Sequence, residues 1–273
     1  MRRLMCPPDY FDIEYVINPW MDLANPVNHE LARRQWDDFV ATLRRFGDEV
    51  EFIDPDRRCP DMTFSGDGGL VVDRTFIPSN FRVPERQLEV QHYVDWFEAR
   101  GFEVARYDSD IAFEGLGDVV FHGSRAVFGH GIRSDRRSLD LLRSHLPDLE
   151  ILCEMRIVDP RFFHLAMALS FISDDCVLYY PPAFDEESCA RLRAAVPDIL
   201  EASDTDTLEY FGCNNLVLGD RLLIDDATPE LEAALAKRGI ETVRCPMSEF
   251  KKSGGSLRCL VLSFIDTSNG TTR

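Results

Sequence analysis

A cysteine and a histidine are the residues of this sequence best suited to covalent chemistry. Cys259 follows a Gly-Gly-Ser-Leu-Arg stretch, and His164 follows two phenylalanines. A thiol beside a histidine forms a nucleophile and base pair, because the imidazole can accept and return the proton of the thiol. Asp67, Glu114 and Asp118 lie next to glycines. Their carboxylates suit a planar cation with several N–H donors, such as guanidinium.

These residues stand at equivalent places of an internal repeat. Each repeat has a small or Gly-containing loop followed by two apolar runs with a short polar break between them. The repeat markers are Gly68, Gly117, Ala168 and Asn215, which recur at intervals of about 50 residues. Similar units around one axis turn equivalent loops toward its centre, so we expect one central cavity lined by these loops.

Helical patterns and short strands complete each unit. The apolar spacing predicts helices over 28–46, 85–100 and 228–238, the last two ended by a glycine. Each unit therefore has the order strand, strand, helix, strand. The further strands are expected at 50–53, 102–107, 240–244 and 256–265.

The predicted fold class is α/β, with the segments near the two ends of the chain supplying the halves of a fifth unit that closes a ring. No Pro/Ser-rich linker divides the sequence, so residues 1–266 are expected to form a single domain. Residues 267–273 are expected to be a disordered tail.

Composition excludes several classes of function. The formal net charge of -18 disfavours nucleic acid and anionic membranes as partners. No secretion signal follows the start, and the longest nearly apolar run, 162–172, is too short to span a bilayer. The eight cysteines include no C-x-x-C pair and match no zinc or iron-sulfur spacing, which favours reduced thiols in a cytoplasm and no metal.

Several motifs resemble one family. They are Cys6-Pro-Pro, 15–21, Pro60-Asp-Met, Glu114-Gly-Leu-Gly-Asp118, Asp159-Pro-Arg-Phe-Phe-His164, 179–185 and 250–259. Together they resemble the guanidino-group-modifying superfamily, or penteins, over residues 4 to 265. Its members include dimethylarginine dimethylaminohydrolases, arginine deiminases, arginine dihydrolases and amidinotransferases. The resemblance implies a five-bladed α/β propeller, which agrees with the repeat count.

The resemblance also implies roles for particular residues. Cys259 attacks the guanidinium carbon, and His164 protonates the leaving nitrogen and then activates water. Glu114 is expected to be a third catalytic residue. Asp67 and Asp118 are expected to lie in or beside the guanidinium pocket. Asn214 is expected to line the same pocket. Cys213 is a second thiol at a central loop, but its motif is weaker than that of Cys259.

Three departures from the family bear on the substrate. Ala166 stands where deiminases and dihydrolases have the aspartate of His-Leu-Asp, and Asp67 adds a carboxylate to an earlier loop. Both changes favour the dimethylarginine hydrolases. Asn80 replaces an arginine that relatives have, which removes a clamp for the α-carboxylate, while Arg133 is retained and could serve as a clamp.

We therefore expect a cysteine-dependent hydrolase of an arginine-like guanidino compound, with N-substituted arginine as the leading substrate class and no cofactor. The alternatives are an amidinotransferase, an arginine dihydrolase or deiminase, and a catalytically weak protein that binds an arginine analogue. The expected partner is a small cationic substrate, and assembly into a homo-oligomer is left open.

Overall fold

Within residues 1–107 and 110–265, which this computed structural model describes, the chain repeats one motif. Two antiparallel strands are followed by a helix and by a third strand that pairs in parallel with the second. Four units follow this order along the chain, as the sequence predicts. They are β3 (Gly69–Val72), β4 (Thr75–Pro78), α2 (Glu89–Glu98), β5 (Glu103–Val104); β6 (Val119–His122), β7 (Arg125–His130), α4 (Ser138–His145), β8 (Glu150–Arg156); β9 (Leu169–Phe171), β10 (Cys176–Tyr179), α5 (Glu186–Ala195), β11 (Asp198–Glu201); and β12 (Leu216–Leu218), β13 (Arg221–Ile224), α6 (Pro229–Ala236), β14 (Glu241–Arg244).

Segments near both ends of the sequence build the fifth unit. Strand β15 (Leu262–Ile265) pairs antiparallel with β1 (Arg2–Met5), with Arg3 opposite Ser263. Strand β2 (Glu49–Phe52) follows α1 (His29–Arg45) and pairs in parallel with β1. The expected assembly of a fifth unit from two distant segments is thus present.

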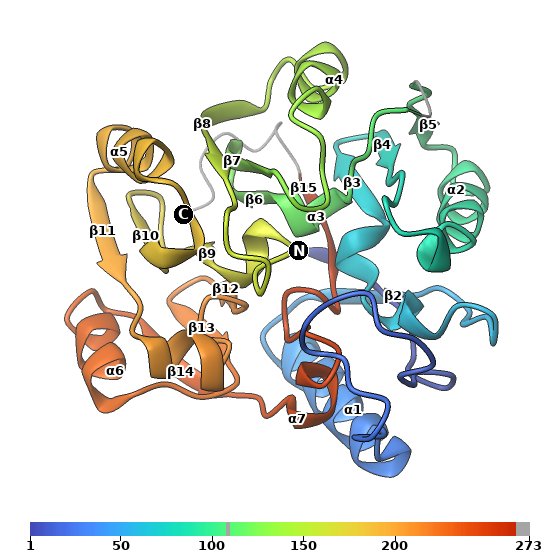
Figure 1. Cartoon of the computed structure of the whole chain (residues 1–273), viewed down its shortest axis with the longest axis horizontal. Coiled ribbons are helices and arrows are strands. Elements are labelled where there is room, and N and C mark those ends of the chain that lie inside the picture. Colours follow the sequence, from blue (N-terminus) through green and yellow to red (C-terminus); the bar gives the residue numbers. More distant parts are fainter. Residues whose placement is uncertain (108–109, 266–273) are drawn as a thin grey trace.

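Strand pairing joins two of these units. The end of β15 pairs in parallel with β3, which gives a six-stranded sheet in the order β2-β1-β15-β3-β4-β5. The other three units of the described chain are separate three-stranded sheets. The prediction of five blades is therefore met only in part, because the pairing gives four sheets and no closed ring of strands. Figure 1 shows these sheets around a common centre, with α1, α2, α4, α5 and α6 on the outside.

Local sequence signals explain where the helices begin and end. The Asn28 side chain accepts a hydrogen bond from the Leu31 N–H and caps α1, while Thr228 caps α6 in the same way. Gly101 and Gly239 follow α2 and α6 with φ of 71° and 75°, a left-handed conformation that favours glycine. The three expected helices are present, and the largest difference is at α2, whose expected first turn is the separate short helix Pro84–Arg86.

Two predicted strands are shorter in the structure. Only Glu103–Val104 of the segment 102–107 joins a sheet as β5. In the segment 256–265 only β15 is a strand, and the preceding residues form buried turns packed against a neighbouring loop. A buried run is mostly apolar whether or not it pairs as a strand. Its composition therefore does not distinguish a strand from a buried turn.

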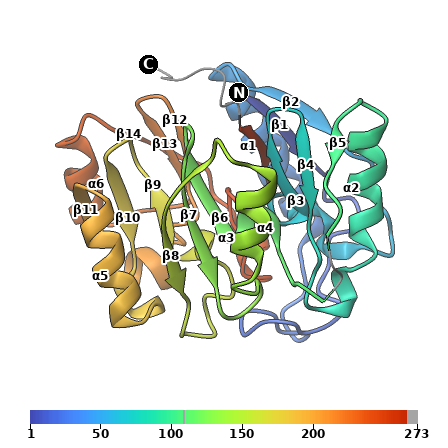
Figure 2. The same ribbon diagram turned by 90° about the horizontal axis from the view of Figure 1, so that it is seen from above.

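Apolar side chains fill the space between each sheet and its helix. The rings of Phe76 in β4 and Phe97 in α2 stack with centroids 3.9 Å apart, and Leu178 and Leu192 are fully buried between β10 and α5. Figure 2 shows these helices lying alongside the strands. Among the helices described, none is long and apolar enough to cross a membrane.

Short helical turns lie between successive units and, in two units, between the second strand and the helix. They are η1 (Pro60–Thr63), η2 (Ser65–Gly68), η3 (Pro84–Arg86), α3 (Gly115–Asp118), η4 (Leu165–Met167), η5 (Pro181–Ala183), η6 (Thr205–Glu209) and α7 (Ser248–Lys251). The proposed tail, 267–273, lies outside the described residues.

Candidate active site

The turns that precede the first strands bring the predicted residues together. Asp67 lies on η2 before β3, and His164 lies directly before η4 and β9. Cys259 lies in the turn before β15, and its carbonyl accepts a hydrogen bond of 2.8 Å from the N–H of Gly66. The repeat therefore places a thiol, an imidazole and a carboxylate at one end of the strands.

Cys259 is 4% exposed and is held by Asn214. The Asn214 Nδ2 group lies 3.1 Å from the Cys259 Sγ, and the Asn214 Oδ1 accepts from the backbone N–H groups of Arg258 and Cys259. Burial and the negative charge of Asp67 raise the pKa of the Cys259 thiol to about 12. In the free protein at neutral pH this residue is therefore a thiol and not a thiolate.

His164 lies between two carboxylates. Its Nε2 is 2.7 Å from Oε2 of Glu114, and its Nδ1 is 3.5 Å from Oδ1 of Asp67. Burial opposes the charged form, but Asp67, Glu114 and Asp118 outweigh it and raise the pKa of His164. The imidazole is thus stabilised as a cation, and its Nδ1 is the nitrogen that faces the Asp67 side.

Glu114 is fully buried behind His164. Its carboxylate also contacts the Arg133 guanidinium at 3.1 Å and accepts from the backbone N–H of Arg82 at 3.0 Å. Despite the cost of burial, His164 and Arg133 lower the pKa of Glu114 to about 2. Glu114 is therefore an anion that orients and charges the histidine.

Asp67 carries a buried ion pair with the protein's own arginine. Its Oδ2 lies 2.6 Å from Nη1 of Arg86, and Arg86 also binds Glu89 through two contacts of 2.8 and 2.9 Å. The Asp67 Oδ1 and the His164 Nδ1 are buried and make no hydrogen bond with the described residues. One oxygen of Asp67 thus remains available to a ligand.

Asp61 is a pocket residue that the sequence reasoning did not single out. Its Oδ2 accepts from the hydroxyl of Tyr15 at 2.7 Å, and its Oδ1 is buried without a hydrogen bond to any described residue. Its only sequence signal is its place in the Pro-Asp-Met motif at 60–62. Arg86 was also missed, because nothing local in the sequence shows that it reaches Asp67.

Several of these side chains border one small pocket, whose lining does not include His164, Glu114 or Asn214. Cys259, Asp61, Asp67, Arg86 and Arg133 line it together with apolar and glycine residues. The remaining lining residues are Ile17, Asn18, Met21, Phe64, Phe163, Ser253, Gly254 and Gly255. Two acidic and two basic side chains beside a thiol suit a ligand that carries both a cationic and an anionic group.

Two predicted substrate contacts hold loops beside the site. Asn80 bridges to Phe113 through the backbone, and its Nδ2 donates to the carbonyl of Ile111. Asp118 accepts from the backbone N–H groups of Leu165 and Ser134, and burial raises its pKa to about 6. Neither residue is among those that line the pocket, and the same is true of His164 and Asn214.

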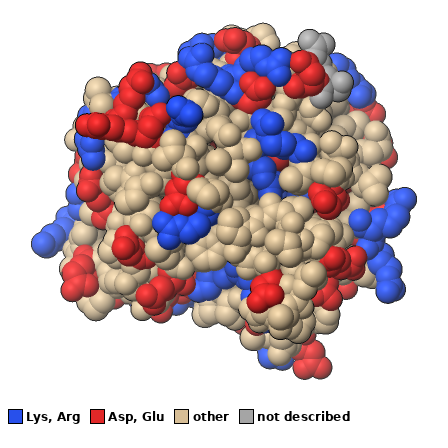
Figure 3. Space-filling model, viewed as in Figure 1, with Lys and Arg blue, Asp and Glu red and all other residues tan. Residues whose placement is uncertain are grey.

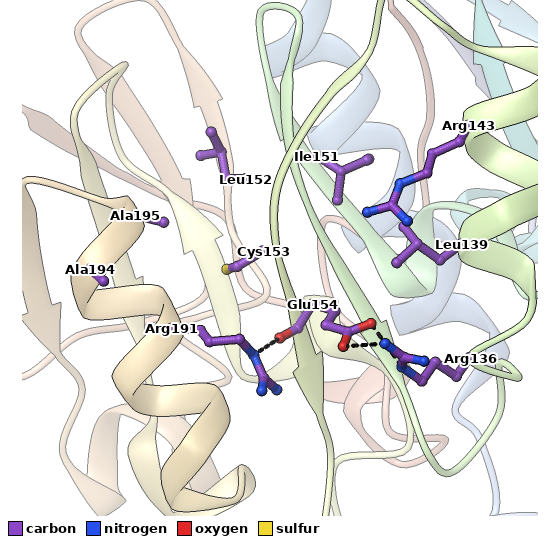
Figure 4. A pocket seen from close by; sticks show the side chains of 10 residues that line it. All are labelled: Arg136, Leu139, Arg143, Ile151, Leu152, Cys153, Glu154, Arg191, Ala194 and Ala195. Carbon is purple, nitrogen blue, oxygen red and sulfur yellow. Dashed lines mark hydrogen bonds and ion pairs between the residues drawn. The ribbon is translucent and has the colours of Figure 1, made fainter.

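A second, wider groove lies on the outside of the molecule, over β8 and between α4 and α5 (Figure 4). It shares no residue with the Cys259 pocket. Acidic and basic side chains are interspersed on the face in Figure 3. Among the described residues, no group of three or more His, Cys, Asp or Glu side chains is placed to hold a metal.

Comparisons with known proteins show the family of this chain. A model of the family N,N dimethylarginine dimethylhydrolase, eukaryotic, matches residues 11–265. The N(G),N(G)-dimethylarginine dimethylaminohydrolase of Mycobacterium tuberculosis is 34% identical over 96% of this chain and 85% of its own length. The bifunctional arginine dihydrolase/ornithine cyclodeaminase ArgZ of Synechocystis is 35% identical over 96% of this chain, which spans 37% of that protein.

A solved structure shows the same fold. The N-terminal domain of ArgZ, as a cysteine-to-serine mutant bound to substrate, has a TM-score of 0.92 and 34% identity, covering 97% of this chain and 99% of that one. A second structure of that domain is covalently bonded to a reaction intermediate.

The fold and site define an α/β enzyme of guanidino chemistry, a cysteine-dependent hydrolase that acts on a carbon–nitrogen bond of an arginine-like compound. The chain belongs to the N,N-dimethylarginine dimethylhydrolase family.

Proposed function

We propose that this enzyme hydrolyses an N-methylated arginine, with Cys259 as the nucleophile and His164 as the acid and base. One observation carries the proposal. The buried thiol of Cys259 lies in a pocket with the available oxygens of Asp61 and Asp67, and the Asp67 oxygen lies 3.5 Å from Nδ1 of His164.

The first step uses the charge of the substrate. A guanidinium beside Cys259 lowers the pKa of the thiol, which loses its proton to solvent, and the resulting thiolate attacks the guanidinium carbon. As the carbon–nitrogen bond breaks, the Nδ1–H of His164 donates a proton to the leaving amine. A covalent amidino-cysteine remains.

Water completes the reaction. His164, now neutral, accepts a proton from a water molecule that attacks the same carbon, and the carbon–sulfur bond breaks to restore the thiol. Dimethylarginine and water thus give citrulline and dimethylamine. Glu114 keeps the ring in position through its contact of 2.7 Å with Nε2.

The two ends of the substrate have separate partners in this proposal. Asp67 accepts from the guanidinium through Oδ1 while its Oδ2 keeps Arg86. Arg133 lines the same pocket and serves the α-carboxylate, while Asp61 offers an oxygen to a positively charged α-amino group. Asn80 and Asp118 support loops and do not contact substrate.

The preference for a substituted guanidine follows from Ala166. A guanidinium has up to five N–H donors, and Ala166 offers no carboxylate to pair them. An unpaired buried donor costs about 1–3 kcal/mol, or about one to two orders of magnitude in kcat/KM. Methyl groups at one terminal nitrogen remove donors and so avoid this cost.

Arginine dihydrolysis is the second candidate. It is favoured by the likeness to ArgZ, at 35% identity in sequence and a TM-score of 0.92 in structure. Transfer of the amidino group to an amine would share the covalent step, and a binding protein without catalysis would not need it. The family match favours water as the acceptor and catalysis over mere binding.

A substrate panel tests the proposal. We would measure kcat/KM for monomethylated, dimethylated and free arginine by the amine released. We expect kcat/KM for the methylated substrates to exceed that for free arginine by about tenfold or more, because one unpaired donor costs at least this factor. Equal or faster turnover of free arginine, with release of two ammonia molecules, would establish the dihydrolase instead.

We also propose a finer description of the whole chain. Its five units correspond to the blades of a five-bladed propeller that forms a single domain over 1–266, two of whose sheets are joined by the β15–β3 pairing. The eight cysteines are free thiols, which supports a reducing compartment such as the cytoplasm. Assembly into a homo-oligomer stays a prediction.

A further inference from the structure

Arg258 differs from the other buried arginines of the described chain. Arg3, Arg86 and Arg133 each form an ion pair with a carboxylate, at 2.8, 2.6 and 3.1 Å. The Arg258 side chain is 8% exposed, and it makes no hydrogen bond or ion pair with any described residue. Its Nε is buried and has no hydrogen-bond partner in the described part of the chain.

A buried cation without an anion is costly, because the low-dielectric interior does not replace the water it loses. Burial and repulsion by Arg3 lower the pKa of Arg258 to about 10. The side chain therefore still carries its charge at neutral pH. A negative group that reaches the guanidinium would offset this charge.

The contacts of Arg258 place its guanidinium on the far side of Cys259 from the substrate pocket. Its guanidinium carbon lies 5.9 Å from the centre of the Phe121 ring, and its charge lowers the pKa of His122. Both residues belong to the end of β6 that is remote from α3. Arg258 is not among the residues that line the substrate pocket.

The surroundings limit the size and charge of a ligand. Among the described residues, the carboxylates that pair with the neighbours of Arg258 are engaged, Asp48 with Arg3 at 2.8 Å and Asp174 with His122 at 2.9 Å. They would repel a multiply charged anion, and Arg258 is only 8% exposed. A small anion with a single charge therefore suits this place better than a phosphorylated metabolite.

We propose that Arg258 binds a small inorganic anion of chloride size, at a site behind the nucleophile and separate from the substrate pocket. The guanidinium supplies N–H donors and Arg3 adds positive potential at the site. This site does not depend on which guanidine the enzyme hydrolyses.

Thermal unfolding in sodium chloride and in sodium gluconate at equal ionic strength tests the site. An anion that binds only the folded protein raises Tm, by about 3 °C or more when its concentration is ten times Kd. We expect chloride to give a saturable rise that gluconate does not give. We also expect the wild-type protein to broaden the chloride-35 NMR line.

Three variants decide the assignment. Arg258→Met should abolish the chloride-specific rise and the line broadening, and without chloride it should unfold at the wild-type Tm or higher. Arg258→Lys keeps a charge and should respond weakly. Arg34→Met, at an exposed arginine, should respond as the wild type does. An undiminished chloride response in Arg258→Met, or none in the wild type, would overturn the proposal.

Discussion

The thiol of Cys259 must become an anion in a place that disfavours anions. Burial is the larger cause of its raised pKa, and the charge of Asp67 adds to it. Arg86 and the amide of Asn214 act in the opposite direction but do not compensate. A bound cation is therefore part of the activation, since it is the charge that the free pocket lacks.

Alkylation of Cys259 by iodoacetamide should report this dependence. In the free protein the rate should keep rising with pH beyond 9, without a plateau near the ordinary thiol pKa, because only the thiolate reacts. Guanidinium ion at millimolar concentration should move the rise to lower pH. Peptide mass spectrometry separates Cys259 from Cys213, whose pKa burial also raises. A plateau at neutral pH in the free protein would contradict this account.

Glu114 should act through the charge of His164. Glu114→Gln removes a carboxylate that raises the pKa of His164, so the protonated imidazole should be lost at lower pH. The alkaline limb of the kcat profile should then shift to lower pH, and kcat should fall about tenfold or more while KM changes little. An unchanged profile would show that Glu114 is not the partner that charges the histidine.

Residue type, the repeat and the family motifs together predicted Cys259, His164 and Asp67 as site residues, and in the structure these side chains lie close to one another. They did not reveal that Arg86 pairs with Asp67 or that Asp61 has a free oxygen in the same pocket. These facts depend on side-chain directions in three different loops, which no local pattern encodes.

At the scale of elements, close backbone approach holds the catalytic groups together. A Cβ atom on Gly117 in α3 would lie 2.8 Å from the ring of His164 and 3.0 Å from the carboxylate of Asp67. Only glycine leaves room for both side chains at this place. The short helix α3 thus sets the distance between the imidazole and its second carboxylate.

Gly117→Ala should lower kcat/KM by about tenfold or more, because a misplacement near 1 Å is enough to disturb catalytic geometry. Steady-state kinetics would measure the effect. Gly47→Ala is the control, since a Cβ there meets nothing within 4 Å although φ is 92°. That variant should lose about 1 kcal/mol of stability and keep its activity. Equal activity of Gly117→Ala and the wild type would show that the packing can yield.

The hairpins could be predicted because two apolar runs around a polar break recur in each unit. The turn that holds Cys259 could not, since 256–265 is buried throughout and mostly apolar, both where it pairs in a sheet and where it packs as a turn. Burial and strand formation leave the same composition in such a run.

At the scale of the molecule, the fifth unit is closed by segments that lie far apart in the sequence. Strand β1 lies between β15 and β2, and Leu4 of β1 is fully buried opposite Leu262. The pairing of β15 with β3 then connects this unit to the first. The repeat predicts the units, but the merging of two sheets depends on this long-range pairing.

Leu4→Ala should destabilise the protein by about 2–5 kcal/mol, as expected for a fully buried leucine whose neighbours cannot close the cavity. Thermal and denaturant unfolding would measure the change. Leu23→Ala removes the same atoms from an exposed side chain, and its free energy of unfolding should stay within about 0.5 kcal/mol of the wild-type value. Equal stability of the two variants would mean that closure by β1 contributes little.

Mass spectrometry of the enzyme with dimethylarginine tests the central claim most directly. The wild-type enzyme should release dimethylamine, and rapid acid quenching should trap an amidino adduct on the peptide that contains Cys259. Cys259→Ser should fold normally and show neither turnover nor adduct, because a hydroxyl is far less nucleophilic than a thiolate. Cys213→Ser should keep both. Turnover by Cys259→Ser at the wild-type rate, or an adduct on another cysteine, would contradict the account.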